Sequence, residues 1–201
     1  MSLSFGNLFM KKSYIIAFWC PIRTIHPQFC LDYFISFFQK YGDIQCMDFQ
    51  SRNDPRTMHL LQQADLVVIG LPANSAYFHS FFCDGHMPFS NVCYAILDYF
   101  PCQEPEASRL CQQYRIPEQL TLHVPYNIQF LESIRLGQVH RYLNAEYKLF
   151  QNEYKRIFLH ELYTAGFRIL NALYQLESYD VSCIFNQCNL IYSSQTHCAA
   201  C

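Results

Sequence analysis

Residues 21–28 (PIRTIHPQ) form the segment of this sequence best suited to bind an anion. The segment follows a short β-branched and aromatic run, residues 13–20, and precedes a stretch with helical spacing, so it is predicted to join a strand to a helix. The first N–H groups of a helix have no partner within the helix, so Arg23, Thr24 and His26 at this junction could hold a small anion. The simpler interpretation is a surface loop without a ligand.

The last residues of the chain have a second pattern with chemical meaning, the spacing C-x4-C-x8-H-C-x2-C. Four thiolate or imidazole ligands are what a structural zinc site requires, and a C-x2-C pair is a usual half-site. The zinc hypothesis therefore takes Cys183, Cys188, Cys198 and Cys201, with His197 beside them. The segment has none of the turn glycines of zinc knuckles, which favours a loosely packed tail without metal. A Cys–His nucleophilic pair is also conceivable, but no spacing singles one out among eight histidines and eleven cysteines.

Strand-like and helix-like segments alternate over the first part of the chain. Strands are predicted at residues 13–20, 43–50, 65–71, 91–100 and 120–126, and helices at 26–41, 54–64, 73–83 and 104–115. Asp54 and Pro55 are typical of a helix start, and Gly42 is typical of a helix end. Because most of these strands are apolar along their length, we expect a three-layer α/β sandwich with a mostly parallel sheet of five or more strands.

A long apolar stripe at helical spacing follows these segments. It consists of Leu143, Tyr147, Phe150, Tyr154, Ile157, Phe158, Leu162, Ala165, Ile169, Leu173 and Leu176. The stripe predicts one or two long helices that pack on the sheet, and it leaves open a contact with a partner helix or a second copy. We therefore expect one domain over residues 1–178 and a cysteine-containing tail over 179–201.

The composition narrows the class of protein. Hydrophobic residues make up 51% of the 201 residues and aromatic residues 17%, which predicts a packed core. A net charge of −2 gives no general attraction to nucleic acid, so no nucleic-acid partner is expected. The first twelve residues do not resemble a signal peptide, and the apolar runs are too short for a membrane span. We expect reduced thiols and a cytoplasmic protein.

Several segments together resemble the MinD/ParA family of P-loop ATPases. The run IIAFWCPIRTIHPQFC corresponds to the family's first strand and its P-K-G-G-V-G-K-T-T loop without a gap. DIQCMDFQ, QQADLVVIGLP, ILDYF, HVPYN and FLESIRLGQ then follow in the family's order, so the resemblance covers about residues 13 to 175. It implies the P-loop fold, with the nucleotide loop at residues 21–28.

The same comparison implies that the nucleotide site is lost. Glycines let backbone N–H groups surround the phosphates, a lysine neutralises their charge and a threonine binds magnesium. Here the glycine positions hold Arg23, Thr24 and His26. The family's signature lysine falls on Ile22, its phosphate lysine on Pro27 and its magnesium threonine on Gln28, and Ile25 stands at the valine position.

Other parts of the family's site depart as well. The interval between the second strand and ADLVVIGLP is too short for the family's separate D-x-P-P strand, and Asp98 stands where the family has a base-reading Asn. Asp48 matches an acidic position but is more simply an ordinary strand end than a metal ligand.

The resemblance therefore implies a pseudo-ATPase that is not an enzyme and uses neither ATP nor another cofactor. Its role would be that of a scaffold or positioning factor, as in the TadZ/CpaE type, which places pilus or secretion machinery in bacterial cells. The expected partner is another protein or a second copy, contacted through Tyr147, Phe150, Tyr154, Ile157 and Phe158. Alternatives are a former nucleotide pocket that binds another small anion or retains weak nucleotide binding, and a metal-linked interaction module built on the cysteine tail.

The stripe hypothesis predicts that the Tyr154→Glu substitution weakens self-association and leaves the fold intact, because a charge would be buried in an apolar contact. Light scattering measures the association and circular dichroism the fold. A wild-type monomer, or unfolding of the variant, would show that the stripe belongs to the core.

Overall fold

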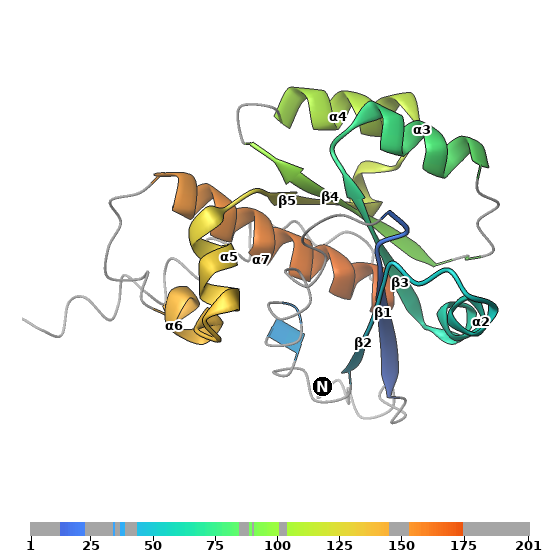
Figure 1. The fold of residues 1–201 in the computed structure, drawn as a ribbon, viewed down its shortest axis with the longest axis horizontal. Helices are drawn as coiled ribbons and strands as arrows, with labels where there is room; N and C mark the ends of the chain where they lie inside the picture. Colours follow the sequence, from blue (N-terminus) through green and yellow to red (C-terminus); the bar gives the residue numbers. More distant parts are fainter. Residues whose placement is uncertain are drawn as a thin grey trace, which may run out of the picture.

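The fold is a five-stranded sheet between two layers of helices (Figure 1). The computed structural model describes residues 13–22, 34, 37–38, 44–84, 89, 91–100, 104–144 and 153–174. The strands are β1 (Tyr14–Trp19), β2 (Ile44–Gln50), β3 (Leu66–Pro72), β4 (Val92–Tyr99) and β5 (Thr121–Pro125). The helices are α2 (Pro55–Gln63), α3 (Ser75–Asp84), α4 (Glu104–Gln113), α5 (Ile128–Arg135), α6 (Val139–Asn144) and α7 (Glu153–Tyr174), and a 3₁₀ turn, Glu118–Leu120, precedes β5. Each predicted strand is thus confirmed to within two residues.

The strands lie in the order β2-β1-β3-β4-β5, and all four neighbouring pairs are parallel. The chain therefore moves in one direction along the sheet from β1 to β2 and in the other direction from β2 onward. Because crossovers between parallel strands are right-handed, this reversal places the connection after β1 on one face and α2, α3 and α4 on the other. The order is that of flavodoxin-like doubly wound sheets, which serve many functions, so it identifies the architecture and not an activity.

Two separate cores lie on the two faces of the sheet. Alternate residues of each strand point to opposite faces, so Leu66 and Val68 enter one core while Val67 and Ile69 enter the other. The first core is completed by helical Phe34, Phe37 and Phe38 together with α5 and α7, and the second by α2, α3 and α4. All of β3 is buried, which explains why its sequence is apolar without alternation.

Helix α7 covers the first face by close packing. A Cβ at Gly166 would lie 2.8 Å from the Phe37 ring, so the glycine lets this ring lie directly against the helix. Phe37 also makes edge contacts with Tyr163, about one turn before the glycine, and with Phe167, the residue after it. At the β5 end, Arg168 donates a hydrogen bond to the backbone oxygen of Thr121 over 2.6 Å. These contacts, all between Tyr163 and Arg168, fix the second half of α7 against the first face.

The apolar stripe belongs to the core from Phe158 to Leu173 of α7. Phe158, Leu162, Ala165, Ile169 and Leu173 are buried, and all belong to the first core. Phe158 is 1% exposed and its ring lies 5.0 Å from that of Phe130. The expectation that Phe158 forms a partner contact is therefore wrong within the folded chain, because this face of the helix already covers the sheet.

Local signals explain α2. Asp54 accepts hydrogen bonds from the backbone N–H and the hydroxyl of Thr57, at 3.0 and 2.7 Å, and Pro55 occupies the first helical position. Both predicted start signals are thus confirmed. Residues 51–65, all described, hold α2 and no strand, so β2 leads to β3 through this helix alone.

No helix in the described ranges is long and apolar enough to cross a membrane.

The capping bond predicts a pH-dependent stability. Hydrogen bonds from Thr57 lower the pKa of Asp54, so the stabilisation is present above the pKa of the unfolded chain and is lost as pH falls through the lower folded pKa. Asp54→Ala should therefore lower the urea midpoint at pH 7 by more than at about pH 3. Asp54→Asn, which still caps but does not ionise, is the control. Equal losses at both pH values for Asp54→Ala would contradict the assignment.

Candidate functional site

The carboxyl ends of β1 and β3 mark the place where a doubly wound sheet binds ligands. The chain reverses direction between these two strands, and the reversal opens a crevice outside their carboxyl ends in such folds. Residues 21–28 follow β1 at this point, as predicted. Pro21 and Ile22 are described, whereas Arg23, Thr24, Ile25, His26, Pro27 and Gln28 lie outside the described residues.

Apolar side chains occupy the start of this loop. Ile22 packs against the second core, although the resemblance places a lysine at its position. Cys20 is buried on the other face, where its sulfur lies so close to Gly70 that a Cβ there would be 2.5 Å from it. The backbone N–H of Cys20 donates to the carbonyl oxygen of Gln50 over 2.8 Å, which holds the chain in line with β2 as it leaves β1.

Trp19, the single tryptophan, is the last residue of β1 and belongs to the core on the second face. Its indole N–H donates to the carbonyl oxygen of Arg52 over 2.9 Å. Its ring is tilted against Phe81 and meets Phe89 edge to face, with centroids 6.4 and 6.0 Å apart. The residues on both sides of the strand end are therefore packed into the cores.

Polar side chains near the carboxyl ends bind nearby backbone groups. Asp48 accepts from the N–H of Gln50, whose φ of 49° makes the turn after β2. Asn74 accepts from Ala76 N–H at the start of α3. Asn127 accepts from Phe130 N–H at the start of α5. These bonds support turn and capping roles, including the strand-end role expected for Asp48. Asp98 lies in β4, as predicted.

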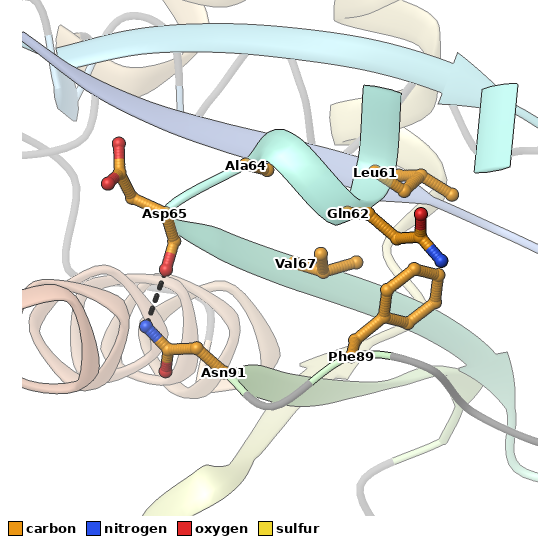
Figure 2. Close-up of a pocket in the computed structure, with 7 residues that line it drawn as sticks. All are labelled: Leu61, Gln62, Ala64, Asp65, Val67, Phe89 and Asn91. Carbon is orange, nitrogen blue, oxygen red and sulfur yellow. Dashed lines mark hydrogen bonds between the residues drawn. The ribbon is translucent and has the colours of Figure 1, made fainter. Parts of the chain in front are cut away.

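A hollow of about 110 Å³ lies at the opposite, amino end of the sheet (Figure 2). Leu61, Val67 and Phe89 line it on one side, and Asp65 and Asn91 on the other. The Asn91 amide donates to the backbone oxygen of Asp65, and the Asp65 carboxylate accepts from Ile15 N–H over 2.9 Å. Ligand pockets usually measure about 300–1,000 Å³, so this hollow is too small for a nucleotide. Its polar groups join the starts of three strands.

The five described cysteines are free thiols, and most of them serve as small apolar side chains. Burial raises the pKa values of Cys46 and Cys93 to about 12 and also raises that of Cys111. Such thiols remain protonated at neutral pH and react slowly. Cys83 is the exposed member of the five.

The remaining predicted site residues either lie outside the described residues or belong to α7. The proposed zinc ligands of the tail, Cys183, Cys188, Cys198 and Cys201, lie outside the described residues, as do Tyr147 and Phe150. Tyr154 lies in α7, and Ile157 is half-buried beside Phe158. In the part of the chain that the structure describes, no group of three or more His, Cys, Asp or Glu side chains could hold a metal.

Neither a protein-family model nor a curated protein matches the sequence, so these comparisons assign no family to the chain.

The structure reveals one pair that the sequence alone did not single out. His79 and Cys83 lie one turn apart on α3, both exposed, with Nδ1 and Sγ 3.3 Å apart. Their four-residue spacing within a predicted helix was the available signal. Sequence spacing does not show whether a side chain is exposed. With eight histidines and eleven cysteines in the chain, it also does not distinguish this pair from other possible His–Cys pairs.

The contact of Cys20 with Gly70 predicts a coupled pair of substitutions. Gly70→Ala should lower the free energy of unfolding by about 1–3 kcal/mol, because the new methyl group meets the Cys20 sulfur and a Leu97 methyl. Cys20→Ala removes the sulfur, so the double variant should lose less stability than the two single losses combined. Urea denaturation of the four proteins measures this coupling. Strictly additive losses would contradict the packing.

Proposed function

We propose that this chain is a non-catalytic relative of MinD/ParA-type ATPases that acts as a scaffold or positioning factor through protein contacts. The packing of Ile22 against the second core carries the proposal. The resemblance places the family's signature lysine at this position. An aliphatic side chain that contributes to the core cannot replace a cation directed toward phosphate, and its burial stabilises the loop start without a ligand.

The interval between β2 and β3 supports the same proposal. It holds only α2, in the place where the family has a further strand that carries the D-x-P-P aspartate. The loop sequence adds Pro27 at the position of the phosphate lysine, which removes a backbone donor together with the amine. Catalysis of phosphoryl transfer depends on positioning and charge neutralisation, and these substitutions remove residues responsible for both.

On the same resemblance, the assembly that the protein positions is pilus or secretion machinery. The domain would then provide a rigid surface, and its two packed cores would maintain that surface without nucleotide.

The proposal predicts no response to nucleotide. A ligand present at 100 times its dissociation constant stabilises a protein by about 2.7 kcal/mol. That raises the thermal midpoint of a domain of this size by at least about 5 °C. Scanning calorimetry with millimolar Mg-ATP and Mg-ADP should therefore show an unchanged midpoint, and titration calorimetry should show no saturable heat. Saturable binding at micromolar nucleotide would refute the pseudo-ATPase proposal.

Scanning calorimetry with inorganic phosphate tests the alternative function, in which the loop binds a small anion other than a nucleotide. A midpoint that rises with phosphate but not with potassium chloride at equal ionic strength would favour a former nucleotide pocket that binds another small anion. In that case Arg23→Gln should abolish the rise, because Arg23 is the cation of the loop.

A further inference from the structure

The outer face of α3 presents a pair of metal-binding side chains. His79 and Cys83 are both exposed, and their spacing places them on one side of the helix. The His79 Nδ1 and Cys83 Sγ atoms lie 3.3 Å apart. A tetrahedral zinc ion with bonds of about 2.0 Å to nitrogen and 2.3 Å to sulfur would hold these atoms about 3.5 Å apart. The helix therefore already presents the two donors at the separation of a zinc chelate.

Two donors are half of an ordinary structural zinc site, which has four. Among the described residues no third His, Cys, Asp or Glu side chain completes a set. A second copy of the chain related by a twofold axis would bring the same two side chains, and the resulting Cys₂His₂ set is one that zinc commonly adopts.

The surrounding surface suits a second α3. Ala76, His79, Ser80 and Cys83 follow the spacing of one helix face, and all four are exposed. From Ser75 to Cys83 the exposed residues include no Lys, Arg, Asp or Glu, so two copies of this face would not repel each other. The small side chains of Ala76 and Ser80 allow two helices to approach closely.

Helix α3 belongs to the layer on the second face of the sheet. Figure 1 shows α3 beside α4, on the opposite side of the sheet from α7. In an antiparallel pair of α3 helices, His79 of each copy would lie next to Cys83 of the other, with the zinc ion on the axis between them. We propose that His79 and Cys83 form half of an intermolecular zinc site that joins two copies of this chain through α3.

This inference goes beyond the proposed function and does not depend on it. The contact face of a ten-residue helix is small compared with the roughly 600–1,000 Å² per partner of a stable interface. The dimer should therefore need the metal.

Analytical ultracentrifugation of the full chain, in a buffer that contains a reductant and no added metal, measures the monomer–dimer equilibrium and tests the proposal. Zinc should convert monomer to dimer at one ion per two chains, and EDTA should reverse the change. His79→Gln and Cys83→Ser should each weaken zinc-dependent dimerisation by more than about 100-fold, since changes outside the ligand shell already cost about 10–100-fold in affinity. Cobalt(II) in place of zinc should give a thiolate charge-transfer band that both variants lose.

His59→Gln is the matched control, because His59 is an exposed helical histidine that contacts Gln63 one turn away and has no thiol partner. This variant should dimerise with zinc like the wild type. Dimerisation that persists in Cys83→Ser would mean that other cysteines hold the zinc, and a wild-type chain that stays monomeric with zinc would equally overturn the proposal. Tyr154→Glu should leave the zinc-dependent dimer unchanged, which separates this contact from one through α7.

Discussion

A parallel sheet must be covered on both faces, and most of this structure follows from that constraint. β3 is buried along its whole length, so neither of its faces can be left to solvent. The second face is covered by α2, α3 and α4, each from the crossover between two successive strands. The first face receives one crossover, after β1, and among the described residues α7 together with α5 covers the strands farther along the sheet. The packing of Gly166 against Phe37 joins α7 to that crossover.

The positions of the elements could be predicted because their signals are local. The apolar run of β3 and the cap formed by Asp54 depend on neighbours in sequence, and both appear where expected. Strand order could not be predicted in this way, since it depends on contacts between distant segments. The stripe in α7 shows the same limit: periodicity identified the apolar face but did not reveal that the sheet already covers Phe158. For the site, the sequence located the loop after β1, whereas the exposure of His79 and Cys83 required the orientation of α3.

Apolar packing surrounds the carboxyl end of β1, where the proposed relatives would hold a phosphate. In a phosphate-binding loop, the residues that follow the strand include flexible glycines and a positively charged lysine. Here the residues next to the strand end are Trp19, Cys20 and Ile22, all of which contribute apolar surface to the cores. Each such contact stabilises the apo protein, and each would have to be broken to admit a phosphate chain. Under the proposed relationship, the same substitutions would account both for the loss of nucleotide binding and for stability without a ligand.

The dependence of the first face on α7 has a consequence during synthesis. The ribosome releases β1 to β5 before α7, and protein synthesis proceeds at about 5–20 residues per second. For several seconds the completed strands lack their cover, and Leu122, Val124 and Phe130 have no Phe158 to pack against. A nascent chain in this state presents a broad apolar surface of the kind that chaperones bind. Folding of this domain is therefore a late event, in which α7 packs against Phe37, a residue made long before it.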